Sequence, residues 1–409
     1  MLLKEIVNKF DKRIQKLSQN PSATGLQSTR LAYEMIRDYY RHLAEPKRAG
    51  EFLTIHDGFI PSEILDAMDI KILNLEFLAY HCVQVGPHYI DRAEKEGISS
   101  DTCSSCRCEM GLVLDGGLPQ PDFIIFESGT CENQFKTNAF LADYFHCPLF
   151  VLNTPYYLNQ TSIKSYVEEI KELIGSLEDF TGKKLDYDRM TESASRFRQA
   201  FASMRELNDL RKTIPCPIRA RDALRNIGIV MHAGHDLRTV EYFQGVCEEV
   251  RGRVARGEGV VPKEQYRLLW CHTAPLFTDI FTFLEEEYGA VVVFDELSYV
   301  GPPADESLGL LEGIALEKIQ YAWNGPAERR LQILLKIAEE YKIDACIHFS
   351  QWGCQIADGS AKMIRDVLEE RLGLPTLILE GDYMDFRINS EEQIKAKLTS
   401  FMDILGKKR

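Results

Sequence analysis

Short apolar runs that alternate with helical segments are the feature that most limits how this chain can fold. They lie in two groups of four, at 52–59, 71–77, 122–127 and 149–152, and then at 267–271, 290–294, 344–348 and 375–380. Runs of this length are typical of strands buried on both faces of a parallel sheet. Alternation with helices implies right-handed crossovers that cover both faces. We therefore predict an α/β fold with two parallel-sheet units.

Helical patterns fill most of the remaining chain. The first 46 residues have helical spacing with a break near Asn20 and Pro21, and further helices are predicted at 87–96, 133–145, 163–173, 188–212, 275–287, 326–342 and 358–372. We predict N-terminal helices with a first α/β domain at 1–185, a helical connection at 186–225, and a second α/β domain at 226–409. The halves match in layout, although no residue-level repeat is visible.

The charge and the apolar pattern exclude several classes of protein. Among 409 residues, 48 basic and 62 acidic side chains give a net charge of −14, which leaves no electrostatic footprint for nucleic acid. No apolar run approaches the roughly 20 residues of a membrane span. The first residues form a charged amphipathic pattern instead of a signal peptide. We expect a cytoplasmic protein whose eleven cysteines are reduced thiols, some of them metal ligands.

Cysteines at the ends of predicted strands mark the candidate site. Cys131 follows the strand at 122–127, and Cys354 follows the strand at 344–348. Ligands of open parallel sheets bind beyond the carboxyl ends of the strands, so facing sheets would bring these thiols into one cleft. Cys103 opens a Cys103-x2-Cys106-x-Cys108 cluster that completes neither a ferredoxin run nor a zinc ribbon. On this local spacing, a zinc knuckle, a redox pair and an iron–sulfur site are equal alternatives.

The other cysteines lie in apolar or helical contexts, and we interpret them as small buried hydrophobes. They are Cys82, Cys147, Cys216, Cys247, Cys271 and Cys346.

Ordered motifs over most of the chain resemble the 2-hydroxyacyl-CoA dehydratase subunits, a family that also contains the cluster-binding subunits of benzoyl-CoA reductase. The resemblance is carried by the order and spacing of several pieces together. They are IPSEILDAMDI with LNLEF (60–77), SSDTC (99–103), PDFII with GTCENQFK (121–136), PLFVLNTPYY (148–157), RLLW (267–270), YGAVVVFDE (288–296), and HFSQWGCQ with RDVLEERLGLPTLILEGDYMDFR (348–387).

The resemblance implies two Rossmann-like domains with a [4Fe–4S] cluster in the cleft between them. The family's ligand positions correspond to Cys103, Cys131 and Cys354, and the fourth iron position would be open to water, sulfide or substrate oxygen. Cys106 and Cys108 depart from the family pattern. We interpret them as spare thiols at a helix start, with a larger double-cubane cluster as the alternative.

The implied activity is a radical elimination of water from a 2-hydroxyacyl-CoA thioester to give a 2-enoyl-CoA, through a ketyl radical anion. Its partners would be a homologous subunit, in a heterodimer or homodimer, and an ATP-dependent iron–sulfur activator that donates one electron. This chain lacks a GxxxxGK[ST] phosphate loop, so ATP hydrolysis is expected in the partner. The alternatives are a low-potential reductase of the same family, which consumes its electrons, and a non-catalytic electron-relay subunit.

Further candidates flank these cysteines. Glu76 is a candidate acid–base group, with a helix-start or surface carboxylate as the alternative. His56 is a candidate for holding the substrate hydroxyl, with a structural histidine as the alternative. Ser350, with its neighbour His348, is expected to hydrogen-bond cluster sulfurs, and Trp352 to shield the cluster unless it packs in the core. Two further expectations are that Asp382 and Asp385 shape the loop after the last strand, and that basic residues at 221–225 meet the phosphates of coenzyme A.

Overall fold

Two parallel sheets organise the computed structural model, which describes residues 2–19, 25–57, 60–83, 88–129, 131–305 and 307–408. Within these ranges the first sheet has the order β2-β1-β3-β4 and the second the order β6-β5-β7-β8. The strands are β1 (Phe52–Asp57), β2 (Ile70–Asn74), β3 (Phe123–Glu127), β4 (Leu149–Leu152), β5 (Tyr266–Cys271), β6 (Ala290–Asp295), β7 (Ala345–Gln351) and β8 (Thr376–Gly381). All paired strands run parallel, which confirms the predicted α/β fold with two Rossmann-like parallel sheets.

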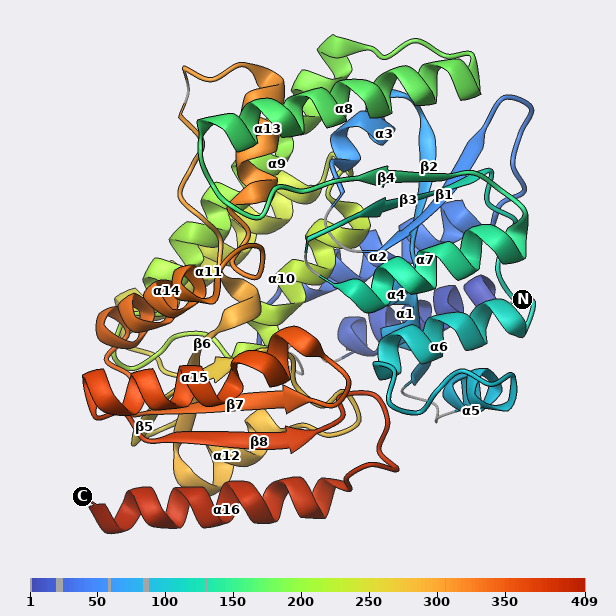
Figure 1. The fold of residues 1–409 in the computed structure, drawn as a ribbon. Coiled ribbons are helices and arrows are strands. Elements are labelled where there is room, and N and C mark those ends of the chain that lie inside the picture. Colours follow the sequence, from blue (N-terminus) through green and yellow to red (C-terminus); the bar gives the residue numbers. More distant parts are fainter. Residues whose placement is uncertain are drawn as a thin grey trace.

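The two sheets share one topology, because the third strand of each lies on the opposite side of the first strand from the second. Each sheet therefore has a switch point, between β1 and β3 in one and between β5 and β7 in the other, where parallel sheets bind ligands. Figure 1 shows the first sheet (blue to green) above the second (yellow to red).

Helices cover both sheets and connect them. In the first half they are α1 (Leu2–Gln19), α2 (Thr29–Ala44), α3 (Ser62–Ala67), α4 (Leu75–Val83), α5 (His88–Lys95), α6 (Ser104–Leu114), α7 (Glu132–Phe145) and α8 (Gln160–Thr181). They continue with α9 (Tyr187–Leu210), α10 (Ala220–Ala233), α11 (Thr239–Arg256), α12 (Ile280–Tyr288), the 3-10 turn η2 (Glu296–Ser298), α13 (Leu310–Ile319), α14 (Ala327–Glu340), α15 (Gln355–Leu372) and α16 (Glu391–Lys408). In the described ranges, no helix combines the length and the apolar composition needed to cross a membrane.

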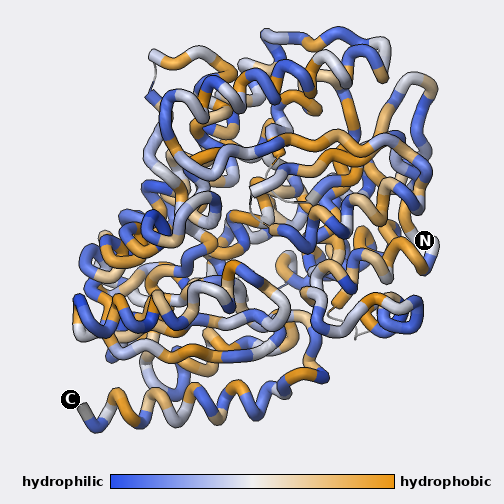
Figure 2. Tube along the Cα trace, viewed as in Figure 1, coloured by the Kyte–Doolittle hydropathy of each residue, from blue (hydrophilic) through white to orange (hydrophobic). Residues whose placement is uncertain are grey.

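The hydrophobic core joins the two halves. One cluster of buried side chains includes Ile55 of β1 and Trp270 of β5, so it reaches both sheets. A second cluster lies on the other face of the first sheet, where Phe123 packs with Ile314 and Ile319 of α13. Figure 1 shows α13 beside α8 above that sheet, and Figure 2 shows the strands as largely hydrophobic. The second half thus contributes a helix to the first half's core, while the three domain boundaries stay a prediction.

Two predicted elements begin or end elsewhere. The run at 71–77 is a strand only to Asn74, whose side-chain oxygen accepts a hydrogen bond from the Phe77 N–H at 3.0 Å and so starts α4. The helix predicted at 275–287 begins only at Ile280, because Asp279 accepts the Thr282 N–H at 3.2 Å as its N-terminal cap. The predicted break at Asn20–Pro21 and the end of the 52–59 run lie outside the described residues.

Candidate functional site

A cavity of about 1290 Å³ lies between the two halves, and three predicted ligands line it. Cys103 and Cys131 come from the first half of the chain and Cys354 from the second, and Cys106 also lines the wall. All eleven cysteines lie in the described part of the chain, where each is a free thiol. The structure thus brings the three thiols to one enclosed volume.

Each of these three cysteines is the N-cap residue of a helix. Cys103 precedes α6, Cys131 precedes α7 and Cys354 precedes α15. The first N–H groups of a helix lack partners within it, and the helix dipole places partial positive charge there, so helix N-termini favour anions. Three helix N-termini around one cavity form an environment that stabilises thiolates and a negatively charged group.

Burial and the helix ends act on the thiols in opposite directions. Burial raises the pKa of Cys131 and raises the pKa of Cys354 to about 12. The backbone N–H of Gln134 lowers the pKa of the first, and those of Ala357 and Ile356 lower the pKa of the second. Because metal ligation requires the thiolate, binding of a metal group would release protons from these thiols.

Cys106 and Cys108 differ in their positions relative to the cavity. The Cys106 thiol donates a hydrogen bond to Cys103, which is the main reason why the pKa of Cys103 is lowered. Cys108 is fully buried, with its sulfur 4.0 Å from the Ala79 carbonyl oxygen, and does not line the cavity. Of the two departures from the family pattern, only Cys106 lies at the site.

Gly353 brings the loop of Cys354 against the loop of Cys103. Its φ is +75°, and a Cβ added there would lie 2.6 Å from the Asp101 carbonyl oxygen and 2.9 Å from the Cys103 nitrogen. The Asn133 side chain donates to the Gly353 carbonyl oxygen at 2.9 Å. A residue without a side chain is required at this position, because the two backbones meet there.

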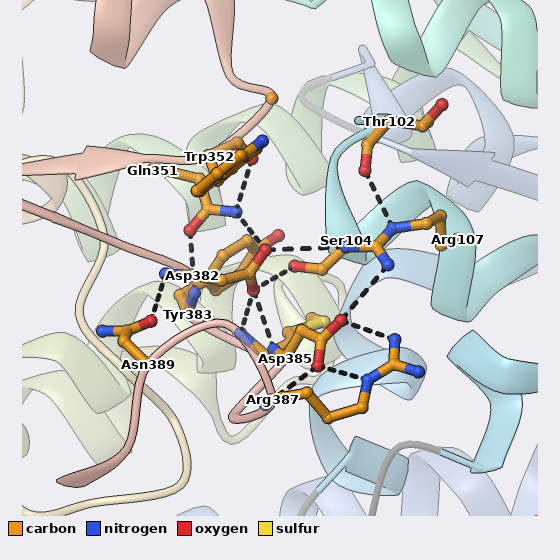
Figure 3. A network of polar contacts seen from close by, with 12 residues as sticks. Thr102, Ser104, Arg107, Gln351, Trp352, Asp382, Tyr383, Asp385, Arg387 and Asn389 are labelled. Atoms are coloured by element: carbon orange, nitrogen blue, oxygen red, sulfur yellow. Dashed lines mark hydrogen bonds and ion pairs between the residues drawn. The ribbon is translucent and has the colours of Figure 1, made fainter. Parts of the chain in front are cut away.

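A buried polar network fixes α6 to the loop after β8 (Figure 3). Ser104 donates to Asp382 at 2.6 Å, and Arg107 contacts Asp385 at 3.2 Å and Asp382 at 3.7 Å. Asp382 also accepts from Gln351 at 3.2 Å and from two backbone N–H groups of its own loop. These contacts confirm that both aspartates shape this loop. They also anchor the helix that starts at Cys103 to the second half of the chain.

Glu76 lines the cavity from the first turn of α4. Tyr80 donates to one carboxylate oxygen at 2.5 Å, and Gln134 donates to the other at 3.3 Å. Burial raises the pKa of Glu76, and these two donors only partly oppose it. Gln134 is three residues beyond Cys131, so the carboxyl group is linked directly to the helix that begins at that thiol.

Three other predicted site residues do not line the cavity. His56 is 3% exposed within β1, between β2 and β3. Ser350 donates to Asp358, and Trp352 is 54% exposed on the outer surface. Their roles at a cluster stay predictions, and the geometry of this chain alone adds no support to them.

His272 and its neighbours are cavity residues that the sequence analysis missed. The His272 Nε2 lies 3.5 Å from the Cys354 sulfur, and its ring stacks on Trp323 with centroids 4.7 Å apart. Burial, together with the charge of Arg330, lowers the pKa of His272 to about 3. The available signal was its position directly after β5, at the switch point of the second sheet.

Basic side chains also reach the cavity wall. Arg221 and Arg225 both line it, as part of the predicted 221–225 segment. Arg221 pairs with Asp279, and Arg225 pairs with Asp222 at 2.9 Å. Their charges are therefore partly balanced within the chain.

The donor set fits an iron–sulfur cluster better than a single ion. In the described ranges, no three His, Cys, Asp or Glu side chains converge tightly enough to hold one metal ion. In a cluster each thiolate binds a different iron, so the ligands surround a body of several atoms. Three thiols around one large cavity, each at a helix N-terminus, match that requirement.

Comparison with known proteins gives the family. The family model described as 2-hydroxyglutaryl-CoA dehydratase, D-component, matches residues 58–405. The chain belongs to this family. Among relatives of this 2-hydroxyglutaryl-CoA dehydratase D-component family, a benzoyl-CoA reductase subunit of Thauera aromatica is 27% identical over 95% of this chain and 97% of its own. The (R)-phenyllactyl-CoA dehydratase alpha subunit of Clostridium sporogenes is 23% identical over 89% of this chain and 92% of its own. The (R)-2-hydroxyisocaproyl-CoA dehydratase alpha subunit of Clostridioides difficile is 21% identical over 92% and 95%.

Proposed function

We propose that this chain is the iron–sulfur subunit of a 2-hydroxyacyl-CoA dehydratase, in which Cys103, Cys131 and Cys354 hold a [4Fe–4S] cluster. One observation carries the proposal: three N-cap thiols from both halves of the chain line a single cavity. The relatives named as dehydratase subunits support the reaction class. The cavity volume of about 1290 Å³ exceeds the usual range for small-ligand pockets, which suits a large thioester beside a cluster.

The cluster would supply an iron with an open position that acts as a Lewis acid on a substrate oxygen, and a site for the activating electron. Glu76 is the proton-handling group of the proposal, because burial keeps its carboxyl protonated to higher pH than usual. Tyr80 and Gln134 orient its two oxygens. A protonated Glu76 can donate to the departing hydroxyl group, and its carboxylate can then accept the β-proton.

Other side chains of the cavity serve binding and exclusion of water. Phe77, Tyr321 and Trp323 supply apolar aromatic surface beside the thiols, which lowers the local dielectric. Arg221 and Arg225 are the candidates for contact with coenzyme A phosphates, because both line the wall. We further propose a homologous partner subunit, since the relatives are themselves named as subunits, and an ATP-dependent activator.

A low-potential reductase of the same family is the second candidate. It is favoured by the 27% identity to the benzoyl-CoA reductase subunit over nearly the whole chain. Cys106, in contact with Cys103 at the cavity, is in addition the thiol that a larger cluster would use.

The test is turnover of 2-hydroxyacyl-CoA thioesters by the anaerobically purified chain with its homologous subunit and activator. A dehydratase needs reductant only in catalytic amounts, whereas a reductase consumes it in proportion to product. Glu76→Gln should lower kcat by at least about a hundredfold, the usual scale of general acid–base catalysis, while the cluster is retained. An intact cluster with no conversion of any acyl-CoA, in the presence of both partners, would contradict the proposal.

A further inference from the structure

We propose that His272 is a positioning residue for Cys354, whose sulfur accepts a hydrogen bond from the His272 Nε2–H. The donor fixes the position of this sulfur and the electron affinity of the group that the sulfur holds. The first part rests on the geometry of this chain, and the second part rests on the proposed function.

The contacts of the ring define the direction of the hydrogen bond. His272 Nε2 lies 3.5 Å from the Cys354 sulfur, and Nδ1 lies 3.1 Å from the Thr273 hydroxyl oxygen. When the hydroxyl donates to Nδ1, the neutral ring carries its proton on Nε2, directed at the sulfur. Stacking on Trp323, with planes 15° apart, holds the ring in this orientation.

The backbone at His272 is strained in a way that serves this orientation. Its φ is +70°, a left-handed conformation that residues with a side chain rarely adopt. Such strain persists where surrounding contacts fix it and gathers at functional sites. Here the fixing contact is a hydrogen bond at 3.0 Å from the His272 N–H to the buried Glu296 carboxylate.

The same carboxylate links His272 to the helix of Cys354. Glu296 pairs with the buried Arg330 through two hydrogen bonds of 2.5 and 2.7 Å. Arg330 in turn donates to the Ile356 carbonyl oxygen at 3.2 Å and to the Ser360 hydroxyl at 2.6 Å, both on α15. Cys354, His272, Glu296 and Arg330 thus form a closed ring with the first turns of α15, so the sulfur and its donor are held in one rigid frame.

Two substitutions separate the hydrogen bond from the backbone. In His272→Gln, the side-chain amide N–H₂ can occupy the position of Nε2, whereas in His272→Asn the amide is too short to reach the sulfur but tolerates the left-handed conformation. His232→Asn is the matched control, because His232 is buried at the same cavity but bonds to Tyr40 and the Gly228 carbonyl.

The first measurement is the midpoint potential of the cluster in the anaerobic full chain, followed by EPR during reductive titration. An N–H donor stabilises the more negative reduced state, so its loss makes reduction harder. We expect the reduction equilibrium constant to fall about tenfold in His272→Asn, or about 59 mV for one electron, and to recover in His272→Gln. His232→Asn should match the wild type.

The second measurement uses the iron-free full chain and needs no cluster. Iodoacetamide labelling of Cys354, quantified by peptide mass spectrometry with Cys131 as internal reference, should slow about tenfold in His272→Asn because the thiolate loses its donor. Wild-type chain without iron would refute the proposed function but leave this test decisive. Iron-loaded chains with equal potentials, or equal or faster Cys354 labelling in His272→Asn, would overturn the inference while the proposed function stands.

Discussion

Substitution of Gly353 by alanine tests how closely the loops of Cys103 and Cys354 are joined. With φ at +75°, the new side chain forces a left-handed conformation that costs about 1–2 kcal/mol. Its Cβ would also lie 2.6 Å from the Asp101 carbonyl oxygen and 2.9 Å from the Cys103 nitrogen. Both neighbours are backbone atoms that no rotamer change can move aside, and overpacking of this kind costs typically about 1–3 kcal/mol. The expected total is about 2–5 kcal/mol.

Gly373→Ala is the matched control, because Gly373 has φ at +63° and no atom within 4 Å of an added Cβ. It should cost only the conformational part, so the two variants should differ by about 1–3 kcal/mol. The assay is urea unfolding of both iron-free variants followed by circular dichroism, with iron content measured separately after anaerobic purification. We expect Gly353→Ala to be the less stable variant and to lose iron as Cys103 is displaced. Equal losses of stability with equal iron would refute the close approach of the two loops.

Two further predictions follow from buried charges. Arg107→Met leaves Asp382 and Asp385 without their buried cation, so we expect a loss of about 3–5 kcal/mol in urea unfolding, whereas Arg256→Met at an exposed ion pair should change little; equal effects would contradict the network. Burial raises the pKa of Glu285 from its ordinary 4.5 to about 7, so the folded chain binds more protons than the unfolded chain between these values, and stability should fall as the pH rises through them. Glu285→Gln should remove that fall between about pH 5 and pH 8 in denaturant unfolding, and an unchanged pH profile would refute the buried position of this carboxyl group.

The strands were predictable because burial on both faces leaves an apolar run in the sequence. β6 and β7 are buried at every position, and their runs stand out accordingly. Helix starts were less predictable, because they depend on single capping groups. Asn74 ends one strand and starts α4 with one side-chain contact, which apolar periodicity does not register. The packing of α13 on the first sheet is a long-range contact with no local signature.

The candidate site was predictable in part for the same reasons. Strand ends at one edge of a parallel sheet place Cys131 and Cys354 near a ligand site, whichever side chains surround them. The orientation of Trp352 was not predictable, because it follows from the left-handed turn at Gly353 that carries the backbone to Cys103. His272 looked like His56, a single histidine near the end of an apolar run. Only tertiary packing distinguishes the first, which contacts a thiol, from the second, which is enclosed between strands.

Iron content of the anaerobically purified chain and its cysteine variants tests the central claim most directly. We predict about four iron atoms per chain in the wild type, and about eight if Cys106 takes part in a larger cluster. Alanine in place of Cys103, Cys131 or Cys354 should abolish the brown chromophore and the iron. Cys247→Ala should retain both, because that thiol is buried in α11 and donates to the Ser203 carbonyl oxygen at 3.3 Å. Equal iron in Cys131→Ala and Cys247→Ala, or a wild-type chain that binds no iron, would contradict the account.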